Sequence, residues 1–205
     1  MSVTVIKYHR AMGRWEPDAR GRLAKAAMEL YAERGFEQTT VAEIAARAGL
    51  TERTFFRHFA DKREVLFYGM EILRELLTRA IADAPASATP LEAVREALEA
   101  AGAMLQENPD RVRLRDAIVS ANPDLQEREL IKLAALAAAL AGALRDRGVP
   151  EPAASLAAET GIAVFKVAFA RWISDHGQPD LPGILRESMA DLRDVVADRP
   201  TVTSR

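Results

Sequence analysis

The chain has 205 residues, of which 28 are Lys or Arg, 30 are Asp or Glu and none is Cys, so its formal net charge is −2. This length can bury a sizeable core, and the lack of cysteine excludes disulfides, thiolate metal sites and thiol redox sensing. No segment reaches the ~20 apolar residues that cross a bilayer, and the first residues lack a signal-peptide core. We therefore expect a cytoplasmic protein with no membrane partner.

The N-terminal arm, residues 1–14, is basic and lacks helical periodicity, with Lys7, Arg10 and Arg14 among its side chains. We expect the arm to be flexible, either as a bland terminus or as a segment that lies along DNA. Residues 1–60 hold ten Lys/Arg and seven Asp/Glu, whereas the rest of the chain holds eighteen and twenty-three. These balances of +3 and −5 predict phosphate contact at the N-terminal end only.

The first predicted helix covers residues 17–34. Pro17 suits the first helical position, where no backbone N–H is needed, and Gly35 can adopt the left-handed conformation that commonly ends a helix. Together with the two short helices that follow, this helix is expected to form a three-helix unit over residues 15–61.

Two short helices hinged at Gly49 are predicted between residues 39 and 59. Thr40 and Glu43 form a capping box for the first helix, and Thr51 can cap the second. A glycine-hinged pair of this kind is typical of the helix-turn-helix, in which the second helix enters the DNA major groove.

The second short helix has Phe55 and Phe59 as its predicted buried anchors, one turn apart. Its remaining side chains suit DNA, because an arginine can bond both major-groove acceptors of guanine and an aromatic ring can touch a thymine methyl. With two residues at helix starts, which favour phosphate, the candidate DNA-binding residues are Thr40, Arg53, Thr54, Phe56, Arg57, His58 and Lys62. The alternatives are a solvated basic face for the arginines, cover for the aromatic anchors for the histidine, and capping and solubility for Thr40 and Lys62.

A set of positions in register gives this region a family resemblance. It comprises Ala26-Ala27, Leu30, Gly35-Phe36, Thr39-Thr40-Val41, Ile44-Ala45, Ala48-Gly49, Thr54-Phe55-Phe56, His58-Phe59 and Lys62. Residues from about Gly13 to Leu66 thereby resemble the TetR/AcrR family of bacterial transcriptional regulators. The resemblance implies an all-α fold of about nine helices, with an N-terminal three-helix helix-turn-helix domain and a C-terminal ligand-binding and dimerisation domain. It also implies a homodimer that represses transcription until a small ligand binds. The family usually has tyrosine at the position of Phe56, so its phenolic phosphate contact is absent here.

Residues 62–198 are expected to form the helical regulatory and dimerisation domain, followed by a frayed tail, residues 199–205. Asp61 is the predicted cap of a long helix that ends near Ala82. Thr89-Pro90-Leu91-Glu92 starts the next helix with a cap, a first-position proline and a capping box in order. The remaining helix boundaries are predicted at Asn108-Pro109, Asn122-Pro123, Gly148, Pro152–His176 and Pro182–Val196.

Pocket and dimer residues follow from the resemblance and from apolar periodicity, with plain core packing as the alternative for each. The candidate pocket residues are Phe67, Met70, Leu73, Met104, Leu105, Ile118 and Phe165. The candidate dimer residues are Ile162, Phe165, Phe169, Trp172, Leu185, Met189, Leu192 and Val196. The basic cluster of Arg111, Arg113 and Arg115 fits an anionic ligand or a solvated face paired with Asp110 and Asp116.

An enzyme is not indicated. The histidines His9, His58 and His176 lack metal-ligand spacing with a carboxylate, and no phosphate-binding glycine loop or nucleophile elbow occurs. We predict no metal and no cofactor. The predicted partners are a double-stranded DNA operator, a second copy of the chain and a small, largely apolar effector of unknown identity. The alternatives are a ligand-independent or nonspecific DNA-binding protein, or an activator instead of a repressor.

Overall fold

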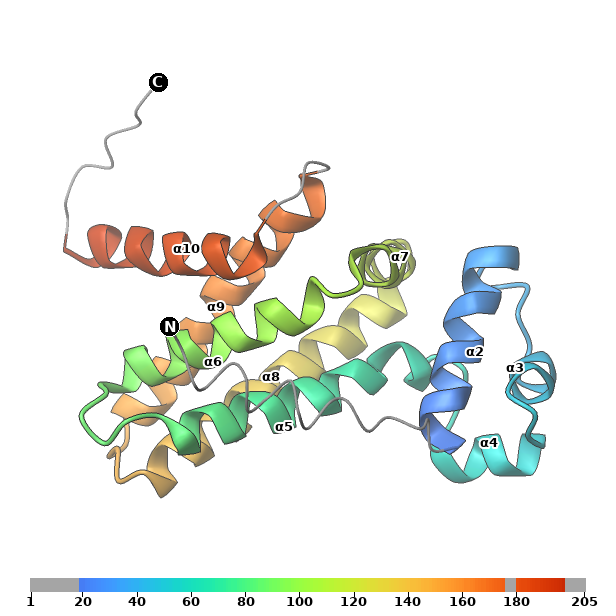
Figure 1. Ribbon diagram of the computed structural model, residues 1–205, viewed down its shortest axis with the longest axis horizontal. Helices are drawn as coiled ribbons and strands as arrows, with labels where there is room; N and C mark the ends of the chain where they lie inside the picture. Colours follow the sequence, from blue (N-terminus) through green and yellow to red (C-terminus); the bar gives the residue numbers. More distant parts are fainter. Residues whose placement is uncertain (1–18, 176–179, 198–205) are drawn as a thin grey trace. The chain divides into compact units, whose positions relative to one another are not determined.

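The computed structural model describes residues 19–175 and 180–197, and this part of the chain contains nine α-helices, one 3₁₀ helix and no strand (Figure 1). The elements are α2 (Ala19–Arg34), α3 (Val41–Arg47), α4 (Glu52–His58), η1 (Glu64–Phe67), α5 (Tyr68–Asp83), α6 (Pro90–Leu105), α7 (Pro109–Ser120), α8 (Pro123–Asp146), α9 (Ala153–Ser174) and α10 (Leu181–Val196). The predicted all-α fold is confirmed. The predictions for the basic arm, for Pro17 and for the tail lie outside the described residues.

The helices belong to two compact units. The N-terminal unit contains the described residues up to Gly69 together with Leu114–Gln126, and the C-terminal unit contains Met70–Arg113 and the described residues from Glu127 onward. Helix α7 therefore contributes residues to both units. The domains predicted from sequence, residues 15–61 and 62–198, stay a prediction.

The N-terminal unit is built on α2, which packs against α3, α4 and η1 (Figure 1). Leu23, Ile44 and Phe55 are fully buried between these short helices. Tyr31 on α2 is also buried, and its hydroxyl donates to the backbone carbonyl of Lys62 at 2.8 Å. Burial, and secondarily the nearby Asp61 carboxylate, raise the pKa of Tyr31 well above its ordinary value. The phenol therefore stays a neutral donor that ties α2 to the segment before η1.

The C-terminal unit has its core where α6, α9 and α10 pack against one another. Two glycines allow the close approach. A Cβ on Gly102 of α6 would lie 2.8 Å from Leu185 Cδ1 of α10, and a Cβ on Gly161 of α9 would lie closer still to Val94 of α6. Helix α6 begins as predicted, with both capping-box bonds formed between Thr89 and Glu92.

The helix predicted after Asp61 begins differently from expectation. Asp61 Oδ1 does accept from the backbone N–H groups of Arg63 and Glu64, at 2.7 and 3.0 Å. The first turn that follows is the 3₁₀ helix η1, and regular α-helix starts only at Tyr68.

Candidate nucleic-acid interface and regulatory surfaces

The starts of α3 and α4 and the turn between them are fixed by the local bonds that the sequence predicts. Glu43 N–H donates to Thr40 Oγ1 at 3.3 Å, and Glu43 Oε2 accepts from the backbone N–H and the hydroxyl of Thr40, at 2.9 and 2.8 Å. Gly49 has a φ of +67°, a left-handed conformation that glycine adopts without a side-chain clash. Thr51 Oγ1 accepts from the Thr54 N–H at 3.2 Å and so caps α4.

This capping box changes the interpretation of Thr40 as a phosphate contact. Both of its donors, the backbone N–H and the hydroxyl, are taken by Glu43. These bonds also hold the pKa of Glu43 below its ordinary value, with smaller contributions from Arg34. A phosphate contact by Thr40 would have to displace a carboxylate that the local structure keeps ionised.

Helix α4 is held by its two predicted aromatic anchors. Phe55 and Phe59 are buried, and their ring centres lie 5.6 Å apart. The edge of Tyr68 meets Phe59 at 6.0 Å, and the Arg20 guanidinium lies 5.3 Å from the centre of the same ring. Because the anchors are enclosed on several sides, the opposite face of α4 has a fixed orientation.

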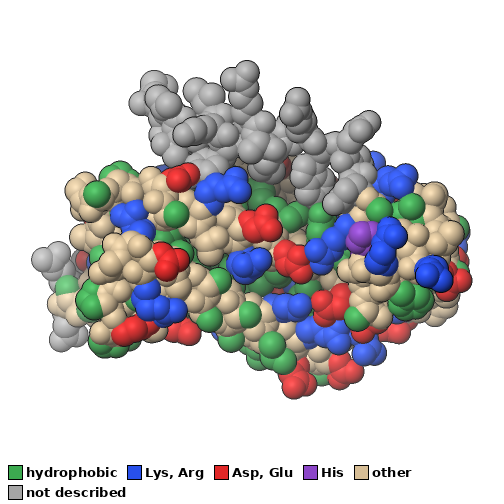
Figure 2. Space-filling model, turned by 90° about the horizontal axis from the view of Figure 1, so that it is seen from below, with side chains coloured by type: hydrophobic (Ala, Val, Ile, Leu, Met, Phe, Trp, Pro, Cys, Tyr) green, Lys and Arg blue, Asp and Glu red, His purple; other side chains and the backbone are tan. Residues whose placement is uncertain are grey.

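The outward face of α4 carries the cations predicted to meet DNA. Arg53 and Arg57 are exposed, and neither has an ion-pair or hydrogen-bond partner among the described residues. Phe56 is 55% exposed, with its ring edge against Phe55 at 5.5 Å. Figure 2 shows Lys and Arg side chains gathered beside the histidine on one face of the molecule. A large exposed aromatic between two unpaired cations is suited to contact bases and phosphates.

Thr54 and His58 are less available. Both are half-buried, and the Thr54 hydroxyl lies 3.0 Å from that of Thr51. His58 Nε2 is enclosed and has no hydrogen-bond partner in the described part of the chain. Because it is enclosed, this nitrogen does not reach a phosphate in the present arrangement.

Lys62 requires a correction, because its ammonium group faces the protein. Nζ donates to the backbone carbonyls of Phe36, Glu37 and Thr39, at 2.9, 3.1 and 3.0 Å, and it lies 4.7 Å from the centre of the Phe36 ring. An ammonium group has three donors, and all three are used. Lys62 therefore joins the loop before α3 to the segment after α4, and the predicted phosphate contact is wrong for this geometry.

Ion pairs join α2 to α3 on the surface of the same unit. Arg47 donates to both oxygens of Glu33, at 2.8 and 2.7 Å, and Arg34 donates to Glu43 at 2.7 Å. The hydrogen bonds from Arg47 are the main reason that the pKa of Glu33 lies below its ordinary value. Arg34 and Arg47 therefore stabilise the packing of α2 against α3, whereas Arg53 and Arg57 of α4 have no such partner among the described residues.

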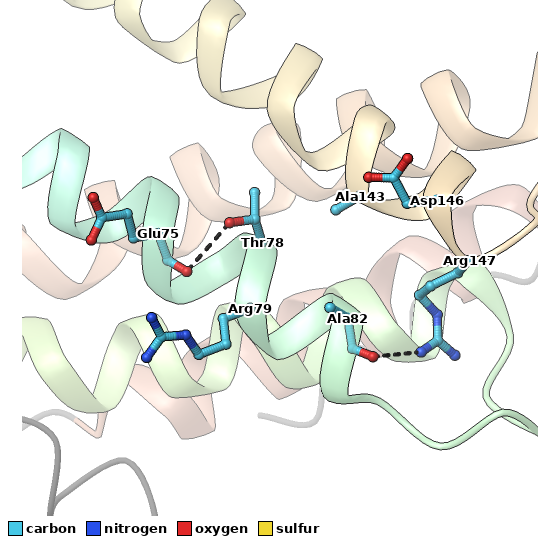
Figure 3. Close-up of a pocket in the computed structure, with 7 residues that line it drawn as sticks. All are labelled: Glu75, Thr78, Arg79, Ala82, Ala143, Asp146 and Arg147. Carbon is cyan, nitrogen blue, oxygen red and sulfur yellow. Dashed lines mark hydrogen bonds between the residues drawn. The ribbon is translucent and has the colours of Figure 1, made fainter.

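The C-terminal unit contains an open cavity of about 440 Å³ between the ends of α5 and α8 (Figure 3). It is lined by Glu75, Thr78, Arg79, Ala82, Ala143, Asp146 and Arg147. Arg147 is structural, because it donates to the carbonyls of Ile81, Ala84 and Pro85 where α5 ends, at 3.0, 2.7 and 2.8 Å.

None of the predicted pocket residues lines this cavity. Phe67, Leu73, Ile118 and Phe165 are buried, and Met70, Met104 and Leu105 are half-buried against the core. These side chains pack against other residues, and none of them lines the cavity shown in Figure 3. An apolar ligand pocket therefore stays a prediction.

The predicted dimer residues divide between core and surface. Five are buried in the core of the C-terminal unit and are corrected to core residues: Ile162, Phe165, Trp172, Leu185 and Met189. Phe169 and Leu192 are half-buried against this core, and Val196 is 78% exposed. The strongest apolar stripe of α9 faces α6 and α10, so it is unavailable to a partner.

A second, weaker apolar face of α9 was missed in the sequence. Leu156 and Val167 are each 65% exposed, and Val195 of α10 is 66% exposed. By length and composition alone, α9 is long and apolar enough to span a membrane. In this structure 44% of its most apolar 18-residue segment is buried inside the protein. The apolar composition of α9 is explained by its position in this structure. One side of the helix faces the core, and the other side is apolar and exposed.

Two of the three arginines of the α7 cluster pack against aromatic rings, whereas Arg111 is exposed. The Arg113 guanidinium lies 5.5 Å from the Trp172 ring and donates to the Asp175 carbonyl at 3.2 Å. The Arg115 guanidinium lies 5.1 Å from the Phe67 ring and donates to the Leu66 carbonyl at 3.2 Å. The predicted pairing of these arginines with acidic neighbours is confirmed for one of them, since Arg113 also lies 3.8 Å from Asp110.

Comparison with known proteins identifies both parts of the chain. Residues 23–68 match the family model described as bacterial regulatory proteins of the tetR family, and residues 88–197 match the MftR C-terminal domain. Over 81 residues, 40% of this chain and 36% of the relative, the chain is 40% identical to the HTH-type transcriptional regulator TcmR of Streptomyces glaucescens. Over 58 residues, 28% of each chain, it is 41% identical to the HTH-type transcriptional repressor KstR2 of Mycobacterium tuberculosis. These curated relatives are thus matched over about a third of their length.

Solved structures extend the similarity over most of the chain. Thermus thermophilus FadR, a TetR-family repressor crystallised with lauroyl-CoA, is 26% identical with a TM-score of 0.57, covering 91% of this chain and 99% of that one. A TetR-family regulator from Syntrophomonas wolfei has a TM-score of 0.66 at 14% identity, covering 90% and 98%, and shares the fold. The matched family and its relatives are transcriptional regulators and not enzymes. With the second family model alone covering more than half of its residues, the chain belongs to the TetR family of bacterial transcriptional regulators.

Proposed function

We propose that the chain is a homodimeric, sequence-specific repressor that a small, largely apolar effector releases from a near-palindromic operator. The observation that carries this proposal is the outward face of α4. Arg53 and Arg57 have no partner there within the described part of the chain, and they flank an exposed Phe56, while the buried Phe55 and Phe59 anchor the helix on its other side.

Base reading follows from the chemistry of that face. Each guanidinium can donate to both O6 and N7 of a guanine, and the Phe56 ring can contact a thymine methyl or a sugar. Phe56 has no hydroxyl to donate to a phosphate. Affinity for the DNA backbone therefore has to come from other donors, such as backbone N–H groups and further basic side chains.

A homodimer supplies the symmetry that a near-palindrome needs. Two copies of α4 about 34 Å apart would enter successive turns of the major groove. The open apolar side chains Leu156, Val167, Val195 and Val196 support dimer formation through α9 and α10. Exposed apolar residues on neighbouring elements mark interaction surfaces more often than isolated ones do.

For the effector we propose acyl-CoA thioesters as the first class to test. The support is the similarity to Thermus thermophilus FadR, which was crystallised with lauroyl-CoA and is 26% identical over 91% of this chain. An acyl chain also satisfies the expectation of a largely apolar ligand. Release follows if the effector binds better to a dimer whose recognition helices are wrongly spaced for DNA.

The test is selection of bound sequences from a random DNA library by the purified full chain at near-physiological salt. A near-palindromic motif is expected, and micromolar lauroyl-CoA is expected to release the protein from that motif. Binding without any motif that disappears as salt rises would reject sequence-specific recognition. A motif that lauroyl-CoA and other acyl-CoAs leave occupied would reject this effector class alone. A reporter with the motif placed over a promoter separates repression from activation.

A further inference from the structure

The outward face of α4 carries its side chains in two rows. Residues four positions apart are neighbours on a helix surface, whereas residues one or two positions apart do not face each other. Glu52 and Phe56 therefore form one row, and Arg53 and Arg57 form the other. All four side chains are exposed. This face thus separates an acid and an aromatic ring from two cations.

The Glu52 carboxylate has no ion-pair or hydrogen-bond partner among the described residues. Two other glutamates of the same unit differ in this respect, because Glu33 accepts from Arg47 at 2.8 and 2.7 Å and Glu43 accepts from Arg34 at 2.7 Å. The arginines of α4 lie one and five positions after Glu52, in the other row, so the helix does not bring them into an ion pair with it. Glu52 is therefore an available acceptor on the face proposed to meet DNA.

A carboxylate on a DNA-binding face has few suitable partners. Phosphates repel it, and an ionised carboxylate accepts hydrogen bonds but donates none. The donors in the major groove are the N4 amine of cytosine and the N6 amine of adenine, and adenine presents the acceptor N7 beside its amine. A second acceptor so close to the amine repels a carboxylate, so cytosine is the better partner.

We propose that Glu52 is a specificity-determining residue, whose carboxylate accepts a hydrogen bond from the N4 amine of one cytosine in each half-site of the operator. The proposal rests on the sequence-specific DNA binding proposed above and names one base that is read.

The other side chain of the same row also suits a pyrimidine. Phe56 is 55% exposed, and an exposed aromatic ring can contact the methyl group of thymine. The row of Glu52 and Phe56 therefore favours pyrimidines, whereas the row of arginines favours guanine. One helical turn advances 5.4 Å, and successive base pairs are 3.4 Å apart. A helix lying along the groove would thus place the cytosine and the thymine within about two base pairs of each other.

The experiment is the library selection repeated with Glu52→Gln and Glu52→Asp in the full chain. Glutamine keeps the length of the side chain and can bond both N6 and N7 of adenine. We expect Glu52→Gln to exchange cytosine for adenine at one position of each half-site, with a change in base preference of about tenfold. Its affinity for random DNA should rise about twofold or more at low salt, because a charge that phosphates repel is removed.

Glu52→Asp separates the reach of the carboxylate from its charge. An acid in the first turn also stabilises α4 through the helix dipole, and aspartate keeps this charge. Its side chain is one methylene shorter, so the preference for cytosine should weaken without a rise in affinity for random DNA. Thermal unfolding of each variant verifies that the fold is kept.

The matched control is Glu107→Gln, which removes an exposed carboxylate from the C-terminal unit and should leave both base preference and affinity for random DNA unchanged. A Glu52→Gln variant that selects the wild-type motif would overturn the role of Glu52 while leaving sequence-specific binding intact. A wild-type chain that selects no motif would overturn both proposals together.

Discussion

The ammonium of Lys62 lies 2.9 Å from the carbonyl oxygen of Phe36 and 4.7 Å from the centre of its ring. These residues are separated by 26 positions in the chain, so their contact closes the helix-turn-helix into a loop. A cation that binds three carbonyls at once stabilises the module from within, and this assignment can be separated from a DNA contact by experiment.

Lys62→Met should reduce the free energy of unfolding by about 2–4 kcal/mol, because three carbonyls lose a charged donor. DNA affinity of the folded fraction should keep its dependence on salt concentration, since no phosphate contact is removed. Chemical denaturation and binding isotherms at several salt concentrations test both parts. Arg63→Ala is the matched control, because the exposed Arg63 side chain has no partner among the described residues. A salt slope reduced by about one in Lys62→Met would restore the phosphate assignment.

Arg53→Ala and Arg57→Ala should each weaken binding to the selected motif by about 1–3 kcal/mol and relax base preference at one position of each half-site. Stability should change by less than about 0.5 kcal/mol, since the side chains are exposed and bond to none of the residues that the structure describes. Repeating the library selection with each variant is the measurement. Equal loss on every sequence would identify that arginine as a phosphate contact.

Phe56→Tyr would add a phenolic hydroxyl at the position where the resemblance to the TetR family leads us to expect one. The ring is 55% exposed, so the added oxygen has room and the fold should be unaffected. We expect tighter binding to all sequences, by about 0.5–1.5 kcal/mol, if the hydroxyl reaches a phosphate. Phe56→Leu is the control for ring size. Weaker binding of Phe56→Tyr to the motif alone would place this ring against a base.

Gly161→Ala should destabilise the C-terminal unit by about 1–3 kcal/mol, because its new methyl group would overlap Val94 of α6. The matched control is Gly69→Ala in α5, where a Cβ meets nothing within 4 Å. That substitution should be neutral or stabilising by up to about 1 kcal/mol, as alanine is favoured over glycine within helices. Thermal unfolding of both variants is the measurement. Equal behaviour of the two glycines would show that α6 and α9 can move apart without cost.

Acid should weaken the helix-turn-helix through Glu43. The pKa of this carboxyl is held below its ordinary value of 4.5, mainly because the backbone N–H and hydroxyl of Thr40 donate to it. A carboxylate with a lowered folded-state pKa contributes stability above its unfolded-state pKa, and the contribution is lost as pH falls through the folded value. The unfolding temperature should thus decrease as the pH falls below 4.5. In Glu43→Gln this decrease of the unfolding temperature should be smaller. A variant with an unchanged acid limb would show that other carboxylates dominate.

Local rules were enough to predict most of the fold. The capping boxes at Thr40 and Thr89 and the left-handed Gly35, Gly49 and Gly148 all lie where their immediate neighbours require them. Such features depend on bonds within a few residues, so the sequence contains all the partners. The anchors Phe55 and Phe59 are likewise defined by spacing within one short helix.

Features that depend on residues distant in the chain could not be predicted from the sequence. The carbonyls that bind Lys62 lie 23 to 26 residues away, and Trp172 lies 59 positions beyond the arginine that covers it. Nothing in the local pattern distinguishes these cations from solvated ones. Both faces of α9 are apolar, and periodicity could not decide which one meets α6 and α10. The less apolar, exposed face of α9 could be identified only from the structure, in which the more apolar face is buried against the core.

The shortness of α4 limits how much information one copy can extract from DNA. A helix of seven residues is about 10 Å long and faces about three base pairs. Three base pairs distinguish about 64 sequences and six distinguish about 4,000, far fewer than the 10⁶ or more competing sites of a genome. Two copies reading base edges alone would therefore occupy many accidental sites. The missing selectivity has to come from the spacing between half-sites and from how readily the intervening DNA deforms, so base pairs that no side chain touches should still be constrained in the operator.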